Sequence, residues 1–111
     1  MEIRKGDREE MQYIITAYDG ADEKAIERRL MAREAHLKSV EERVKEGQHL
    51  YGAAILDDNG KMRGSMIVVD FPSREELENW LRVEPYVVAN VWQKIEIKPC
   101  KVAPIFMELY D

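Results

Sequence analysis

The sequence predicts an α+β protein of the ferredoxin-like βαββαβ type, with a four-stranded antiparallel sheet and both helices on one face. The first observation is the order of its segments, because runs rich in β-branched and aromatic residues alternate with two helical patterns as strand, helix, strand, strand, helix, strand. The second is that the first and third strands, 11–18 and 62–71, are apolar on both faces. Two helices cover only one face of a sheet, so we expect a symmetric homodimer packed sheet to sheet.

The composition is typical of a single soluble domain. The chain has 111 residues, a formal net charge of −5 and 35% charged residues, with both signs mixed along the sequence. Nucleic-acid binding is disfavoured because it requires a basic face, and no apolar run approaches the length of about 20 residues that spans a membrane. Cys100 is the only cysteine, so an internal disulfide is excluded and a cytoplasmic location fits best.

The N-terminal half is expected to contain an extension, a strand and one long helix. Residues 1–10 are nearly all polar and lack periodicity, which predicts a flexible extension before a single domain over residues 11–111. After the strand at 11–18, the helix begins near Asp22 as its N-cap and ends at Gly47. Its apolar stripe, expected to face the core, consists of Ile26, Leu30, Leu37, Val40 and Val44. Arg33 falls on the same stripe, and His36 falls at its border with solvent.

The next segment is expected to form a β-hairpin and a second helix. Strands at 49–56 and 62–71 flank an Asn59-Gly60 pair, which favours a type I′ turn. Ser73 to Glu76 then forms a capping box for a helix with one apolar side. That side is formed by Leu77, Trp80 and Leu81.

The C-terminal segment is interrupted by prolines. Pro85 ends the second helix, because the residue before a proline is pushed out of the α region, and a short helical turn at 87–91 follows. A fourth strand is expected at 92–98, ended by Pro99, and residues 105–110 are expected to form one more short strand.

Several segments together carry a resemblance to a known family. They are the opening strand 11–18, the run Arg33-Glu34-Ala35-His36-Leu37, the pair Gly64-Ser65, and 83–91 followed by 95–99. Over roughly residues 11–100 the chain resembles the YciI-like (YCII-related) family of the dimeric α+β barrel superfamily. The resemblance implies that fold, a dimer, and a His–Asp pair as the candidate active site of a family whose physiological reactions are mostly unknown.

The resemblance places His36 at the family's histidine and Glu84, directly before Pro85-Tyr86, at the family's aspartate. A histidine titrates near neutral pH, and a carboxylate bonded to its Nδ1–H would leave Nε2 free for a substrate. Glutamate adds a methylene, roughly 1.5 Å of stem. Either the loop withdraws and the pair is kept, or Glu84 forms a structural salt bridge to Arg33 or another helix residue.

Three further residues are candidates for substrate binding. Arg33, one turn from His36, would hold an anionic group, while Ser65 supplies a hydroxyl and Tyr86 a phenol. No metal site or other cofactor is expected, because His36 and His49 are far apart in sequence and no thiolate cluster accompanies them. His49 is expected to lie at the surface or partly buried, without a role.

Two classes of function fit these residues. The first is a small cofactor-free enzyme, a lyase, isomerase or dehydrohalogenase-like protein, in which His36 acts as general acid/base on a small anionic substrate and Glu84 orients it. The second is a non-catalytic dimeric module that binds a small ligand or serves as an accessory protein. An enzyme requires His36 within hydrogen-bond reach of Glu84 and open to a cavity.

Overall fold

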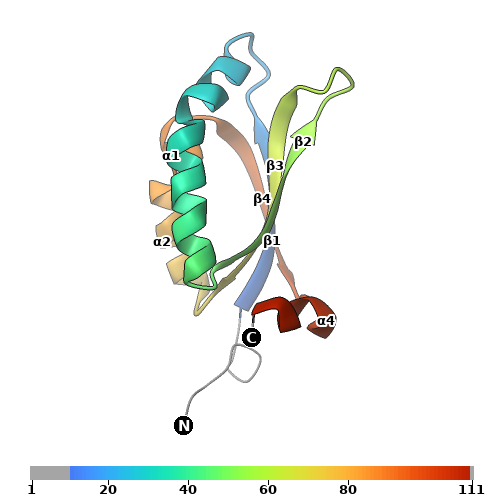
Figure 1. Ribbon diagram of the computed structural model, residues 1–111. Helices are drawn as coiled ribbons and strands as arrows, with labels where there is room; N and C mark the ends of the chain where they lie inside the picture. Colours follow the sequence, from blue (N-terminus) through green and yellow to red (C-terminus); the bar gives the residue numbers. More distant parts are fainter. Residues whose placement is uncertain (1–10, 111) are drawn as a thin grey trace.

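The computed structural model describes residues 11–110 and consists of one sheet with its main helices on one face (Figure 1). The four strands are β1 (Met11–Asp19), β2 (His49–Leu56), β3 (Met62–Phe71) and β4 (Trp92–Cys100). They pair antiparallel in the order β2-β3-β1-β4. The expected ferredoxin-like α+β arrangement is therefore confirmed. The extension expected at residues 1–10 lies outside the described residues.

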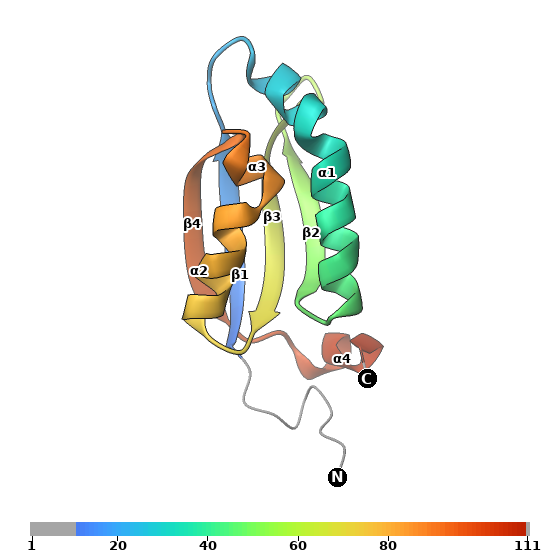
Figure 2. The ribbon, with the colours of Figure 1, turned by 90° about the vertical axis from the view of Figure 1, so that its left-hand side faces the viewer.

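The main helices lie side by side on the same face of the sheet. Helix α1 (Ala25–Lys45) passes over the β2 side, while α2 (Arg74–Val83) and the short α3 (Pro85–Val88) pass over the β1 and β4 side (Figure 2). Two of the expected helix ends are confirmed: the Ser73 hydroxyl caps α2 by accepting the Glu76 N–H at 3.1 Å, and Gly47, at φ 74°, closes α1. None of the helices among the described residues combines the length and apolar character needed to cross a membrane.

The core lies between this helix layer and the central strands. Tyr13, Ile15 and Ala17 of β1 lie opposite Val69, Ile67 and Ser65 of β3, and all six side chains are buried. Leu77, Trp80 and Leu81 of α2 pack against them, which confirms the apolar side predicted for this helix. Burial of these side chains removes apolar surface from water and fixes the helices on the sheet.

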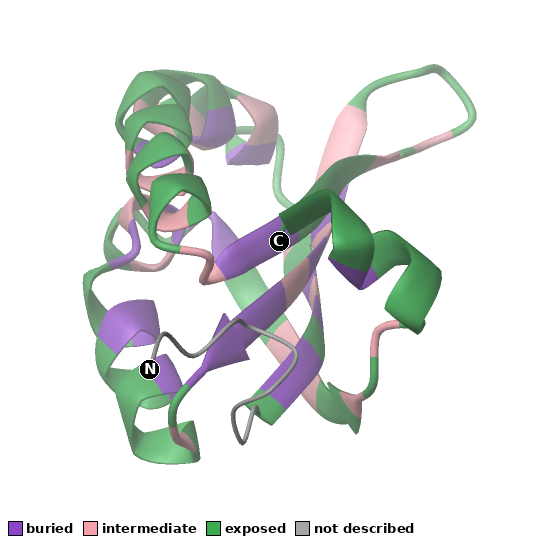
Figure 3. Cartoon of the chain, turned by 60° about the horizontal axis from the view of Figure 1, so that its bottom comes forward, coloured by how far each residue is buried: buried purple, intermediate pink, exposed green. Residues whose placement is uncertain are grey.

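The opposite face of the sheet is also apolar and is largely uncovered. Ile14, Tyr18 and Tyr51 are exposed, and Met66 and Val68 are only half-buried. The C-terminal segment forms a short helix, α4 (Pro104–Met107), and a 3₁₀ helix, η2 (Glu108–Tyr110), on this side (Figure 3). The two-sided apolar character of the central strands is thus present, and the sheet-to-sheet dimer stays a prediction.

Local predictions fail at three points, each for an identifiable reason. The type I′ turn is wrong, because Gly60 has a positive φ of 79° and Asn59 does not; the Asp57 carboxylate instead accepts the backbone N–H groups of Asn59 and Lys61. Strand β4 continues through Pro99, which an edge strand tolerates since it needs no N–H there. The strand expected at 105–110 is helical, with Pro104 at the first helical turn.

Helix α1 differs from the prediction in its rotation as well as in its start. It begins at Ala25 with Lys24 at the N-cap, not Asp22. Its buried residues are Ala25, Arg29 and His36, whereas Leu30 of the expected stripe is 56% exposed. The helix is therefore rotated by about one residue, roughly 100°. The reason is that buried partners hold Arg29 and His36, as the site below shows.

Candidate functional site

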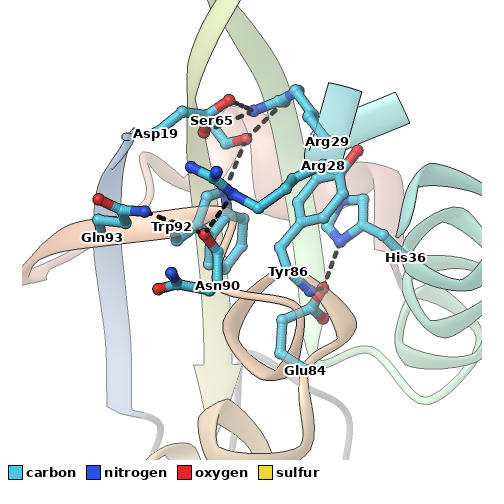
Figure 4. Close-up of polar contacts among 10 residues, drawn as sticks. All are labelled: Asp19, Arg28, Arg29, His36, Ser65, Glu84, Tyr86, Asn90, Trp92 and Gln93. Atoms are coloured by element: carbon cyan, nitrogen blue, oxygen red, sulfur yellow. Dashed lines mark hydrogen bonds and ion pairs between the residues drawn. The ribbon is translucent and has the colours of Figure 1, made fainter. Parts of the chain in front are cut away.

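The centre of the candidate site is a histidine–glutamate pair. His36 Nδ1 is hydrogen-bonded to Glu84 Oε1 (Figure 4), and the Glu84 carboxylate is fully buried at 0% exposure. Glu84 occupies the extended residue between α2 and α3, as expected before a proline, and its Oε1 also accepts the Tyr86 backbone N–H at 3.2 Å. A carboxylate oxygen accepts hydrogen bonds, so this pairing calls for the proton on His36 Nδ1 and leaves Nε2 as the remaining ring nitrogen.

This arrangement shows how the longer glutamate side chain is accommodated. Glu84 is the N-cap of α3, so its carboxylate satisfies the start of that helix and reaches α1 at the same time. The salt bridge to Arg33 that the sequence left open is not the pairing the structure shows, because Arg33 is exposed.

Two aromatic rings fix the orientation of the histidine. The Tyr86 ring stacks on His36 with centroids 3.9 Å apart and an interplanar angle of 11°. The Trp92 ring meets His36 edge-on at 5.7 Å. Both aromatic side chains are buried. The imidazole is thus held by a hydrogen bond at one edge and by packing on its face, which restricts its rotation.

A second polar group lies beside the pair and is built on Arg29. Arg29 is 3% exposed, and its Nη1 donates to both carboxylate oxygens of Asp19 at 3.0 and 3.1 Å (Figure 4). Its Nη2 donates to the Ser65 hydroxyl at 2.8 Å, and Trp92 Nε1 donates to the same oxygen at 3.2 Å. Both lone pairs of the Ser65 oxygen are therefore occupied, so its own proton is available to donate elsewhere.

An open cavity of about 330 Å³ connects these groups. It lies between α1 and strands β2 and β3, and Arg33, His36, Ser65 and Tyr86 all line it. The structure therefore brings these four predicted residues to one cavity, with Glu84 behind His36. Part of the expected core stripe of α1 lines this cavity: Leu37, Val40 and Val44.

The electrostatics of the site follow from burial and charge pairing. Burial raises the pKa of the Asp19 carboxyl, and the Arg29 guanidinium opposes that shift. Burial also raises the pKa of the Tyr86 phenol, so it is a neutral hydroxyl at pH 7. No group of three or more His, Cys, Asp or Glu in residues 11–110 is placed to bind a metal ion.

The sequence interpretation missed Arg29, Asp19 and the position of His49. His49 was expected at the surface or partly buried, but it is 3% exposed and lines the same cavity. One signal was present: Ala25, Arg29, Ala32 and His36 recur at helical spacing, with two small residues that permit close approach. The apolar stripe beside them was the stronger pattern, and it concealed this one.

These features define a class of protein: a ferredoxin-like α+β domain with a buried His–carboxylate pair at a half-open cavity. The sequence pattern of the YCII-related domain matches residues 11–101, and the chain belongs to that family. It is 34% identical over 97 residues to Protein YciI of Escherichia coli, covering 82% of this chain and 97% of that protein. An uncharacterized protein of Haemophilus influenzae is 31% identical over the same length and coverage.

Solved structures show the same fold at low sequence identity. The 5-chloro-2-hydroxyhydroquinone dehydrochlorinase TftG of Burkholderia phenoliruptrix, in complex with 2,5-dihydroxybenzoquinone, superposes with a TM-score of 0.72 at 19% identity, covering 84% of this chain and 96% of that one. A dimeric ferredoxin-like protein from an uncultured marine organism has a TM-score of 0.51 at 16% identity, covering 85% and 96%. A putative antibiotic biosynthesis monooxygenase of Nitrosomonas europaea has a TM-score of 0.51 at 12% identity, covering 86% and 91%.

Proposed function

We propose that this protein is a small enzyme that needs no cofactor and catalyses proton transfer, as an isomerase or an eliminating lyase, on a small anionic substrate. The observation that carries the proposal is the His36–Glu84 pair, in which Nδ1 is bonded to a buried carboxylate while the ring lines a cavity. A positioned imidazole of this kind contributes to catalysis as general acid or base. Glu84 acts through His36, as a positioning residue.

The proposed chemistry divides among the residues that line the cavity. His36 Nε2 removes a proton from one substrate atom; in an isomerisation it returns that proton to another atom, and in an elimination a leaving group departs with its bonding electrons. Arg29 and Trp92 both donate to the Ser65 oxygen and leave its hydroxyl proton free. Ser65 donates that proton, in a hydrogen bond, to the oxyanion that develops on the substrate. Arg33 supplies positive charge at the cavity wall for the substrate's anionic group. The Tyr86 hydroxyl remains neutral and can donate a hydrogen bond.

The choice of reaction class has support from the structural neighbour of known activity. TftG removes chloride from a chlorinated hydroxyhydroquinone and binds 2,5-dihydroxybenzoquinone, as its description states. The cavity here contains groups that elimination from a hydroxylated ring requires, namely a base, an oxyanion donor and a cation. Halogenated hydroquinones are therefore the first compounds to assay.

We further propose that two copies of the chain pack through the uncovered face of the sheet. Ile14, Tyr18 and Tyr51 are exposed on that face, and related structures are described as dimeric ferredoxin-like proteins. Burying this face would remove apolar side chains of the central strands from water. Most of the cavity lies on the other face, beside α1, and Tyr51 belongs both to the cavity lining and to the proposed interface.

The test combines turnover with a direct observation of the pair. Halide release from a set of chlorinated hydroquinones is measured for the wild type and for His36→Gln, which should lose activity by about 10²- to 10⁴-fold. Arg43→Gln, on the same helix but outside the cavity lining, is the control and should keep wild-type activity. Nitrogen NMR should show His36 protonated on Nδ1, and Glu84→Leu should shift the ring toward the Nε2–H tautomer.

Two results would contradict the proposal. Equal turnover by the wild type and His36→Gln would remove the histidine from the chemistry. A wild-type His36 protonated on Nε2 alone would contradict the pairing itself. A ligand-binding module remains the alternative, and it would show the Nδ1–H tautomer together with ligand binding and no turnover.

A further inference from the structure

The cavity contains a second buried histidine, His49, to which the proposed mechanism gives no role. His49 is the first residue of β2 and lies opposite Val69 of β3. The register shifts between His49 and Tyr51, so that two β2 residues oppose one residue of β3, as in a β-bulge. The shift leaves His49 and Leu50 both buried, where a regular strand would have directed them to opposite faces.

The surroundings of the His49 ring satisfy its packing but not its polar atoms. The ring meets Trp80 edge-on, with centroids 6.4 Å apart. Its Nδ1 is buried and has no hydrogen-bond partner among the described residues. Its Nε2 lies on the Gly52 side, where a Cβ on that glycine would come within 3.3 Å, and both residues line the cavity. Buried polar atoms in folded proteins are normally paired, so an unpaired imidazole at a cavity wall is unusual.

His49 is a neutral group at neutral pH. Burial lowers its pKa to about 4, and the Glu84 carboxylate opposes that shift. The uncharged ring can form a hydrogen bond with a neutral group of a ligand without the cost of burying a charge.

The positions along β3 and α1 give the cavity two polar ends. His49 lies beside Val69 of β3, but its Nε2 lies on the side of Gly52. Gly52 pairs with Ile67, which is two residues, about 7 Å, along the strand from Ser65. Arg29 contacts Ser65, and His36 follows Arg29 by seven residues, about 10 Å along the helix. His36 is nonetheless close to Ser65, because its ring contacts Trp92, whose Nε1 donates to the Ser65 hydroxyl. The cavity therefore has Ser65 and the arginines toward one end and His49 toward the other, and apolar side chains complete its wall: Leu37, Val40, Val44 and Ile67.

We propose that His49 is a ligand-binding residue of the cavity, whose Nε2 forms a hydrogen bond with a hydroxyl or phenol group of an anionic aromatic ligand. The anionic group lies at the Ser65 end, and the hydroxyl lies at the His49 end. This inference rests on the proposed function and narrows its substrate class to hydroxylated aromatic anions. 4-Hydroxybenzoate carries these two groups at opposite ends of an apolar ring.

The test compares 4-hydroxybenzoate with benzoate, which lacks the hydroxyl. We expect the wild type to bind 4-hydroxybenzoate about 3- to 10-fold more tightly, the effect of one neutral hydrogen bond. His49→Asn places its amide near the position of Nδ1 and should reduce this preference to less than about 2-fold. His49→Gln places its amide near the position of Nε2 and should restore part of it. Benzoate affinity should be the same in all three proteins, which controls for the fold of the variants.

Each alternative outcome is decisive. A full preference for 4-hydroxybenzoate in His49→Asn would overturn the proposal, as would His49 ring nitrogen signals that do not move when 4-hydroxybenzoate binds. Failure of both compounds to bind at millimolar concentration would overturn the ligand class. The proposed function is judged separately, by the His36 tautomer and by halide release, neither of which depends on these two compounds.

Discussion

Replacing Arg29 by methionine should destabilise the protein more than any substitution of its surface arginines. The Arg29 and Asp19 side chains are 4% and 1% exposed, so removing the cation leaves a carboxylate buried without its partner. Loss of one member of a buried ion pair costs about 3–5 kcal/mol. For a chain of this size, at about 4 °C per kcal/mol, the melting temperature should fall by about 12–20 °C.

The neighbouring residue provides a matched control. Arg28 is paired with Asp22 at 2.7 Å, a shorter contact than the 3.0 Å between Arg29 and Asp19. However, the Arg28 and Asp22 side chains are 27% and 52% exposed, and solvent screens such pairs. Arg28→Met should therefore have a small effect. Distance alone would predict the opposite order, so the comparison isolates burial as the cause.

The loss in Arg29→Met should also depend on pH. The unfolded Asp19 has a pKa near 3.8, the folded pKa is raised by burial, and removing Arg29 raises it further. A folded carboxyl with a raised pKa retains its proton, so the deficit should be small near pH 4 and grow as pH rises through the raised pKa. Urea unfolding at pH 4.5 and pH 7.5, at one protein concentration, measures this difference. A loss below about 1 kcal/mol, or an equal loss at both pH values, would refute the reasoning.

Two further predictions concern the sheet. Ile14→Lys, on the uncovered face, should give the mass of a monomer in light scattering. Leu30→Lys, on α1, is the control and should keep the mass of the wild type. Equal masses for the two variants would exclude this face as the interface. Gly64→Ala should lose about 1–3 kcal/mol in thermal unfolding, because its Cβ would lie 2.5 Å from the backbone oxygen of Ala17. A Cβ at Gly52 would have the His49 side chain as its nearest neighbour, at 3.3 Å, with backbone no nearer than 3.9 Å, so Gly52→Ala should lose less. The reverse order would show that β1 and β3 separate easily here.

The fold could be predicted because its signals are local. Alternating apolar residues, the Ser73 cap and the glycine after α1 each determine a nearby conformation, and the structure has them at the expected places. The rotation of α1 could not be predicted in this way. An apolar stripe normally marks the buried face, but Arg29 and His36 are buried because Asp19 and Glu84, distant in sequence, compensate their polarity.

The His36–Glu84 site was predicted by resemblance to a family and not from a local sequence pattern. The pairing of His36 with Glu84 came from resemblance, since 48 positions separate the two residues and no periodicity connects them. His49 was missed because its burial coincides with the register shift in β2, which leaves two successive side chains buried. A regular alternation along HLYGAAIL contains no sign of that shift.

The double contact of Glu84 has a thermodynamic consequence. One carboxylate oxygen accepts both the His36 ring N–H and the Tyr86 backbone N–H that begins α3. The Glu84 carboxylate therefore couples the conformation of α3 to the orientation of the His36 ring. By reciprocity, a ligand that binds better to the oriented imidazole must stabilise the α3 turn by the same coupling free energy. Ligand binding in the cavity should then be measurable as slower hydrogen exchange of the backbone amides of residues 86–88.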